Sequence, residues 1–448
     1  EFPNVLCGEI DSKFMCLPDE VLVTSMRVHQ KYFALKNKDG KIEPYFLVVA
    51  NRKPNKKTDS IIVKGNERVL RARLSDALFF WESDQVKSLK AHREKLGSIM
   101  FYAGLGQVSD KVDRMEELAA SIAKFIPGCS QFDASQAASL SKSDLVTGMV
   151  GEFPELQGIM GGYYASAQSI VESQTLAIRD HYLPKGGEDR LPETAEGIVV
   201  SMADKIDTLV GFFAVNVRPT GSKDPFALRR AALGILRMIE ECAIQIPLDQ
   251  IFEKAADLYG FKKVDDELAT FITERLKVRL KDNGISYDVV SAAIIDADIQ
   301  NIYNQIEKVK ALEEMLKKPS GVKLLESWRR AANMLVAETK KLKAEVNSFY
   351  ASLQLADEIV IDESLFKSSA ERKLFKVVAA LPNKVGETQK QICQTIQQYS
   401  SLYEPITEFF ETVIVNDNDK KIRNNRLNLL KIVCGKINLI ADFDKIER

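Results

Sequence analysis

The sequence predicts a mainly α-helical protein of several domains, with a small α+β module at its N-terminal end. At 448 residues the chain has room for about two to four domains of ordinary size. Two β-rich runs at 31–36 and 45–50 flank Asn37-Lys38-Asp39-Gly40, whose Asp-Gly pair is a strong hairpin signal. From Gly106 onward apolar residues recur at helical spacing between breaks at Gly and Pro.

Each element follows from a local signal. Leu17-Pro18-Asp19-Glu20 predicts the start of a short helix ahead of the hairpin. From Asn66 the pattern becomes helical, with an apolar face formed by Val69, Leu74, Leu78 and Trp81. Further helices are expected at 111–125, 134–149 and 193–213, and amphipathic helices follow between 247 and 320. Lys-Lys-Pro-Ser-Gly at 317–321 marks a boundary before a last bundle.

These patterns divide the chain into four segments. We expect an α+β module with following helices at 1–105, an all-α domain at 106–245, a helical linker or body region at 246–321 and a helical domain at 322–448.

Composition describes an ordinary soluble globular protein, with 45% hydrophobic and 28% charged residues. No apolar run approaches the roughly 20 residues of a membrane helix, so we expect no membrane role. Six cysteines are scattered without a CxxC pair, which predicts reduced, buried thiols and a cytoplasmic location. The chain begins with Glu1-Phe2-Pro3, and we expect it to be a fragment of a longer protein.

No sequence motif predicts catalysis. A GxxxxGK[ST] phosphate loop, a GxGxxG turn, a GxSxG elbow and a plausible Cys/His pair are all missing from the sequence. His181 follows Asp180, but a loop histidine before Tyr182-Leu183-Pro184 is more often structural than a metal ligand.

Charge distribution favours a phosphate-bearing partner more than the net charge of −1 does. Residues 27–73 hold thirteen Lys or Arg and four acidic residues, and residues 308–343 hold ten and four. Clusters of this size are typical of a nucleic-acid footprint. Taken singly, each cluster is more typical of a lysine-rich surface that keeps a protein soluble.

Arg229 and Arg230 are adjacent in the sequence and form a further candidate contact for nucleic acid. Asp224 is predicted to cap a helix at 226–236, with Pro225 at its first position. At least one of Arg229 and Arg230 should reach solvent, where it could pair with phosphate. The alternative is an ion pair within the fold, to Asp224 or to Asp204 and Asp207.

The segment at 203–237, ADKIDTLVGFFAVNVRPTGSKDPFALRRAALGILR, resembles the beta subunit of bacterial heterotetrameric glycyl-tRNA synthetase. Other segments are similar to the same family in the same order: QKYF at 30–33, GNERV at 65–69, RARLSDA at 71–77, MVGEFPELQGIMG at 149–161 and RNNRLNLL at 423–430. The resemblance covers most of the chain, is weakest at about 247–323, and implies that an N-terminal part of the family's chain is absent.

The resemblance implies a degenerate HD-like fold, the architecture of metal-dependent phosphohydrolases, for the middle helical domain. Ser143-Asp144 stands where the fold's His-Asp pair would be expected, and Asp204 or Asp207 would be the later carboxylate. Without the imidazoles we expect no catalytic metal. The last domain would be an anticodon-binding helical bundle, similar to that of arginyl-tRNA synthetase.

The function that the resemblance implies is tRNA capture. This chain would position tRNA(Gly) for ATP-dependent glycylation on a separate alpha subunit, in an alpha2beta2 assembly, with ATP and Mg used by that subunit. We expect no catalytic residue, metal or cofactor in this chain, and no DNA partner. Candidates for tRNA contact are Lys31, Arg68, Arg71, Arg73, Arg229, Arg230, Arg329, Arg330, Asn333, Arg423 and Arg426, with Lys340, Lys341, Lys343, Asn424 and Asn425 nearby.

Two other functions are weighed beside tRNA capture. The middle domain could be an HD-type phosphohydrolase, which the missing histidines oppose. The chain could instead be a purely architectural subunit whose basic surfaces meet acidic protein.

Overall fold

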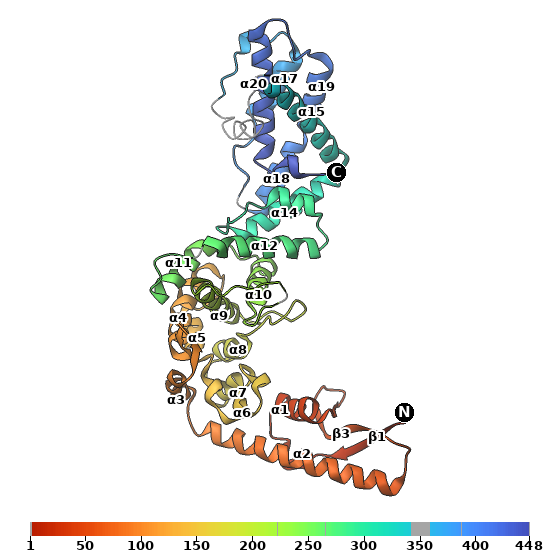
Figure 1. Cartoon of the computed structure of the whole chain (residues 1–448), viewed down its shortest axis with the longest axis vertical. Coiled ribbons are helices and arrows are strands. Elements are labelled where there is room, and N and C mark those ends of the chain that lie inside the picture. The colour runs from red at the N-terminus through yellow and green to blue at the C-terminus, as the bar shows by residue number, and fades with distance from the viewer. Residues whose placement is uncertain (1, 222, 265, 342–358, 387, 448) are drawn as a thin grey trace. The chain divides into compact units, whose positions relative to one another are not determined.

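The structure is a computed structural model, and it describes residues 2–221, 223–264, 266–341, 359–386 and 388–447 (Figure 1). The chain forms two compact units. The first contains residues Glu1–Met238 and Gln250–Asp265, and the second contains Ile239–Asp249 and Asp266–Arg448.

The first unit begins with a three-stranded antiparallel sheet of order β1-β3-β2. Its strands are β1 (Pro3–Glu9), β2 (Phe33–Lys36) and β3 (Ile42–Asn51). The predicted hairpin joins β2 to β3. The Asn37 side-chain oxygen accepts hydrogen bonds from the N–H groups of Asp39 and Lys41, and Gly40 supplies the required positive φ of 81°. Helix α1 (Asp19–Thr24) is also confirmed, whereas β1 was not predicted.

Helix α2 (Lys56–Gln85) begins ten residues before the predicted start at Asn66. Asn55 is its N-cap and accepts hydrogen bonds from the N–H groups of Lys57 and Thr58. Leu70, Leu74 and Ala77 are the buried apolar positions, whereas Val69 is 45% exposed. The predicted apolar face was therefore placed partly wrong. In Figure 1 α2 runs along the sheet, and it contacts both β1 and α6.

A helical body follows α2. Its elements are α3 (Leu89–Arg93), β4 (Met100–Tyr102), β5 (Gly106–Gln107), α4 (Val108–Ile122), α5 (Gln131–Leu140), α6 (Gly148–Glu152), α7 (Ile159–Ala167), α8 (Glu172–Asp180), α9 (Ala195–Ala214), α10 (Leu228–Glu241) and α11 (Leu248–Tyr259). Helices α4, α5 and α9 pack against one another, and α8 packs on α5, α7 and α9. Most of α9 is buried, so this helix forms the centre of the body.

The helix predicted at 134–149 is interrupted. Helix α5 ends at Leu140, a 3₁₀ turn covers Ser143–Val146, and Thr147 caps α6 by accepting from the Val150 N–H. The Asp144 carboxylate accepts hydrogen bonds from the N–H groups of Gly158 and Gly161. This long-range anchor accounts for a break that helical periodicity did not indicate.

The second unit contains helices joined by short loops, and none of its described residues forms a strand. It contains α12 (Asp266–Asp282), α13 (Tyr287–Ala293), α14 (Ile302–Leu316), α15 (Pro319–Lys341), α17 (Ser369–Ala379), α18 (Gln389–Ser400), α19 (Tyr403–Thr412) and α20 (Lys420–Asn438). Helix α15 packs on α19 and α20, α17 packs on the same two helices, and α14 packs on α18. The segment 317–321 spans the two-residue junction between α14 and α15, and both helices belong to the second unit.

Cysteine placement differs from the prediction in one respect. All six thiols are free, as predicted, but Cys7, Cys16, Cys242 and Cys393 are exposed and Cys434 alone is fully buried. The scattered sequence positions excluded a CxxC site but carried no information on burial. None of the helices in the described part of the chain is long and apolar enough to span a bilayer.

Candidate nucleic-acid interface

The N-terminal candidates lie on and beside α2, and most already have protein partners. Arg71 pairs with Asp11 at 2.8 Å, and Arg73 pairs with Glu152. The Lys31 ammonium donates to the Val28 carbonyl but is exposed. Arg68 is exposed and forms no ion pair with any described residue. Arg68 and Lys31 are therefore the most available cations of this set.

The Arg-Arg pair lies in the first turn of α10, which begins later than predicted. The Asp224 carboxylate accepts from the N–H groups of Leu228 and Arg229 and so caps the helix, but Asp224 lies four residues before the first helical residue, and Pro225, predicted at the first helical position, lies outside the helix. However, Ala227 has a φ of 56°, so the helix starts at Leu228 and not at 226. Arg230 is exposed and Arg229 is half-buried, and neither guanidinium forms an ion pair within the described residues.

The carboxylates of Asp204 and Asp207 are bound elsewhere, so the internal ion pair considered for Arg229 and Arg230 is not observed. Near these arginines, Phe226 is partly exposed and stacks on Phe212, with ring centroids 4.3 Å apart. The edge of Phe226 meets Tyr102 at 5.3 Å. The segment before α10 thus presents aromatic and cationic groups together, a combination suited to unpaired nucleotides.

Helix α15 carries the clearest exposed set. Arg330 lies over the Phe410 ring, 4.5 Å from its centroid, and Asn333 is exposed one turn further on. Arg329 is half-buried and donates to the Ile446 carbonyl at 2.6 Å. The backbone of α15 includes Lys340 and Lys341, and Lys343 lies outside the described residues. Arg330 and Asn333 are the exposed candidates among the side chains of this helix that the structure describes.

Helix α20 carries both exposed and buried candidates. Asn424 is exposed and Arg423 is half-buried. Asn425 is buried and hydrogen-bonds both the N–H and the carbonyl of Asp362. Arg426 is also buried, with its guanidinium 2.8 Å from Glu371 and 2.9 Å from Asp417. In this structure Arg426 therefore braces the bundle, which helical periodicity alone did not reveal.

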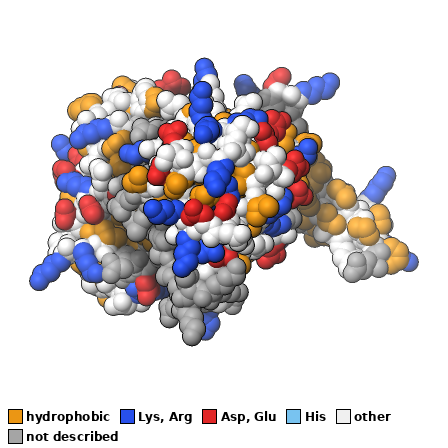
Figure 2. All heavy atoms as spheres, turned by 90° about the horizontal axis from the view of Figure 1, so that it is seen from above, with side chains coloured by type: hydrophobic (Ala, Val, Ile, Leu, Met, Phe, Trp, Pro, Cys, Tyr) orange, Lys and Arg blue, Asp and Glu red, His pale blue; other side chains and the backbone are white. Residues whose placement is uncertain are grey.

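Charged residues are dispersed on the face seen in Figure 2, where Lys and Arg side chains alternate with acidic ones.

A buried charge cluster occupies the place where a metal site was weighed. The Lys111 ammonium lies 3.0 Å from both Asp204 and Asp207, and Lys142 lies 2.9 Å from Asp204. Arg114 binds the other oxygen of Asp207 at 2.6 Å. Both carboxylates are thereby neutralised by protein cations, which are attached to helix α4 and to the turn after α5.

The surroundings of this cluster shift several pKa values. Burial lowers the pKa of Lys142 to about 8 and that of Lys205 to about 7. Burial alone would raise the pKa of Asp204, but the charges of Lys111 and Lys142 outweigh it and lower that pKa. Burial raises the pKa of Asp144 to about 6. The cluster therefore contains lysines that bind their protons less tightly than in water.

The histidine weighed as a metal ligand is buried. His181 contacts the Ile178 carbonyl through Nδ1 at 2.6 Å, and burial lowers its pKa well below the usual value. Its neighbour Asp180 pairs with Arg179 and Arg190. Across the described ranges, no three His, Cys, Asp or Glu side chains are grouped closely enough to hold one metal ion.

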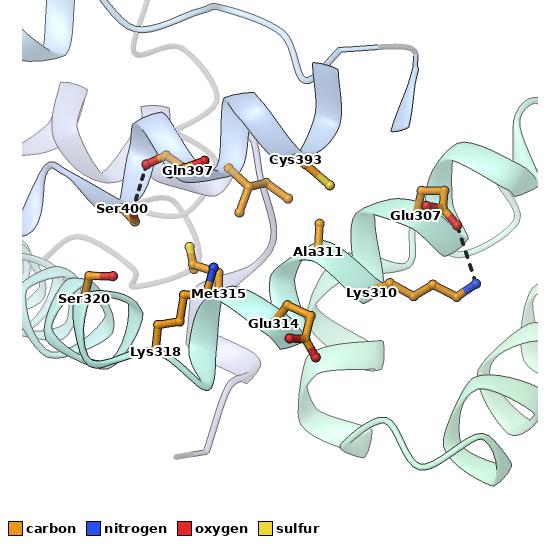
Figure 3. Close-up of a pocket in the computed structure, with 11 residues that line it drawn as sticks. Glu307, Lys310, Ala311, Glu314, Met315, Lys318, Ser320, Cys393, Gln397 and Ser400 are labelled. Carbon is orange, nitrogen blue, oxygen red and sulfur yellow. Dashed lines mark hydrogen bonds and ion pairs between the residues drawn. The ribbon is translucent and has the colours of Figure 1, made fainter. Parts of the chain in front are cut away.

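Sequence reasoning missed the pockets of the second unit, and one of them combines apolar and polar lining residues. It has a volume of about 350 Å³ and lies between α14 and α18, with the start of α15 at one end (Figure 3). Met315 and Ile396 form an apolar floor, and Cys393, Gln397 and Ser400 line the α18 side. The signal available in the sequence was the glutamine-rich run QKQICQTIQQ at 389–398.

Comparison with known proteins defines the class of this chain. Residues 351–439 match a family described as DALR anticodon binding domain, and residues 1–295 match one described as glycyl-tRNA synthetase beta subunit. The fold and these matches place the chain among the aminoacyl-tRNA synthetase proteins.

Individual relatives agree with the family match. Glycine–tRNA ligase beta subunits from Rhodospirillum centenum, Rickettsia bellii and Phenylobacterium zucineum are 41%, 40% and 40% identical to it. Each alignment covers 100% of this chain but only 62%, 63% and 64% of the relative. The chain belongs to the glycyl-tRNA synthetase beta subunit family, and it spans less than two thirds of the length of these relatives.

Proposed function

We propose that this chain captures tRNA(Gly) for glycine–tRNA ligase and positions it for glycylation on a separate alpha subunit in the cytoplasm. The observation that carries the proposal is the joint match of one chain to the synthetase beta subunit family and to an anticodon-binding domain. ATP and Mg would be used by the alpha subunit, in an alpha2beta2 assembly. Binding energy spent on tRNA would orient its acceptor end for the partner's reaction.

Exposed cations support this role. Arg68 on α2, Arg230 on α10 and Arg330 on α15 all face solvent. None of the three has an ion-pair partner among the described residues, and Arg330 lies over the Phe410 ring and donates to the Phe410 carbonyl. Guanidinium groups in this state can bind phosphates without first breaking a protein ion pair.

The alternative of a phosphohydrolase in the middle domain is disfavoured by the lysines. Lys111 and Lys142 hold the carboxylates of Asp204 and Asp207 that such a site would use, and both ammonium groups are buried. A divalent ion would have to displace two buried cations that are tethered to the chain.

The test is the affinity of the chain for tRNA(Gly) and for the same tRNA with a replaced anticodon, each over a salt series. We expect tighter binding of the intact anticodon and a steep loss of affinity with salt for both RNAs. Arg330→Ala should weaken binding. Arg190→Ala is the matched control, since Arg190 is also exposed but is already paired with Asp180 and Glu193. Equal, weak binding of both RNAs would favour the purely architectural subunit.

A further inference from the structure

The pocket between α14 and α18 combines a small apolar floor with a polar rim. Met315 and Ile396 are almost fully buried beneath it, at 5% and 2% exposure. Its volume of about 350 Å³ lies at the lower end of the roughly 300–1,000 Å³ typical of small-ligand sites. A flat group of modest size could cover the floor and exclude water from both buried side chains.

Hydrogen-bonding groups surround this floor from two elements. Figure 3 shows Gln397 and Ser400 of α18 on one side of the pocket, with Met315 and Lys318 on the other. Gln397 is exposed, and its carboxamide offers both donors and an acceptor. Ser320 adds a second hydroxyl from the start of α15. Paired donors and acceptors beside an apolar surface match the edge and the face of a nucleobase.

The charges around the pocket nearly cancel, with one exception. Lys310 lies 3.0 Å from Glu240 and 3.5 Å from Glu307, and Glu314 is bound by Lys317 at 2.8 Å. Lys318 is exposed and forms no ion pair with a described residue. The site therefore suits an uncharged ring that carries a single phosphate nearby, and it suits a polyanion or a free carboxylate less well.

We propose that this pocket receives one unpaired nucleobase of the tRNA, with its phosphate beside Lys318. The inference rests on the proposed tRNA-binding function and assigns it a base-binding subsite. Half of the site comes from α14, which lies outside the matched residues 351–439. The base would lie on Met315 and Ile396, and Gln397 would bind its edge.

Cys393 provides a direct measurement, because this exposed thiol lines the pocket. The full chain is treated with iodoacetamide with and without tRNA(Gly), and peptide mass spectrometry follows the alkylation rate. At a tRNA concentration roughly ten times Kd, about nine tenths of the protein is bound, so the rate at Cys393 should fall about tenfold. Cys242 is exposed but does not line this pocket, and it serves as the internal reference.

A series of anticodon stem-loops, each lacking the base of one loop nucleotide, identifies the occupant. One stem-loop should bind about ten- to a hundredfold more weakly and lose protection of Cys393, as expected for the loss of one stacked base. Ala311→Phe would fill the pocket and should cause a similar loss with the intact stem-loop. The two losses should not add, because both remove the same contact. The matched control is Ala379→Phe, at an exposed position outside the pocket.

The outcomes separate the two proposals. If tRNA(Gly) does not bind the parent chain at all, the proposed function fails. If tRNA binds but Cys393 reacts at an unchanged rate, or Ala311→Phe binds as tightly as the parent, the base pocket is wrong while tRNA binding stands. Protection that persists when every loop base is removed also overturns the pocket assignment, because a backbone contact would then cover Cys393.

Discussion

Replacing Arg426 by Ala should destabilise the second unit, even though its place beside the basic residues of α20 made it a candidate for tRNA contact. The Arg426 guanidinium is buried, and it binds Glu371, whose side chain is fully buried, at 2.8 Å. It also donates to the Ile414 carbonyl at 2.9 Å and thereby ties the segment before α20 to the bundle. The substitution would leave a buried carboxylate without its cation.

The size of the loss follows from these contacts. Removing one partner of a buried ion pair costs roughly 3–5 kcal/mol of unfolding free energy. Glu371 would keep hydrogen bonds from the N–H groups of Lys367 and Ser368, so we expect the lower end, about 3 kcal/mol. For a unit of this size that corresponds to a fall in Tm of about 10 °C.

The assay is urea unfolding followed by tryptophan fluorescence. The chain has two tryptophans. Trp328, 2% exposed in the second unit, becomes the only reporter once Trp81 is changed to Phe in every variant. Arg426→Met combined with Glu371→Gln should recover much of the loss, because it leaves no unpaired buried charge. A destabilisation below about 1 kcal/mol for Arg426→Ala would show that the Arg426–Glu371 ion pair does not stabilise the second unit. An equally stable variant that loses tRNA affinity would restore Arg426 as an RNA contact.

Three further predictions concern other charged groups. Arg330→Ala should leave the stability reported by Trp328 unchanged. It should reduce the magnitude of the slope of log affinity against log salt concentration by about one unit. An unchanged slope would exclude a phosphate contact at Arg330. The stability of the first unit should rise by about 1–2 kcal/mol from pH 7 to pH 8.5. Burial lowers the pKa of Lys205 to about 7 in the folded state, so the unfolded state binds more protons in this window and deprotonation favours folding. Lys205→Met should remove most of this rise in denaturant titrations and leave the smaller part that comes from Lys142, whose pKa burial lowers to about 8. An equally steep rise would contradict the assignment. Asp224→Ala should lower the free energy of unfolding by about 1 kcal/mol, because it removes the cap of α10. Hydrogen exchange at the backbone amides of Leu228 and Arg229 should become faster. Unchanged protection of these amides would show that Asp224 does not cap the helix.

The sequence by itself determined much of the local structure. The hairpin around Asp39-Gly40, the cap at Asp224 and the short helix at Asp19 depend on residues within a few positions, so short motifs specify them. The family followed in the same way from segments such as PTGSKDPFALRRAALG, and the comparisons agree.

Only the tertiary structure decided which charged side chains are available. Arg426 and Arg423 stand three residues apart on one helix, yet one is buried against Glu371 and the other is half-exposed. Lys111 and Asp207 are far apart in sequence but form a buried ion pair. The pocket beside Cys393 is likewise formed by residues of three helices, α14, α15 and α18. Whether an arginine is free to bind RNA or instead stabilises the fold depends on residues that are distant in sequence. These residues determine whether its guanidinium is buried and ion-paired, and local periodicity does not reveal them.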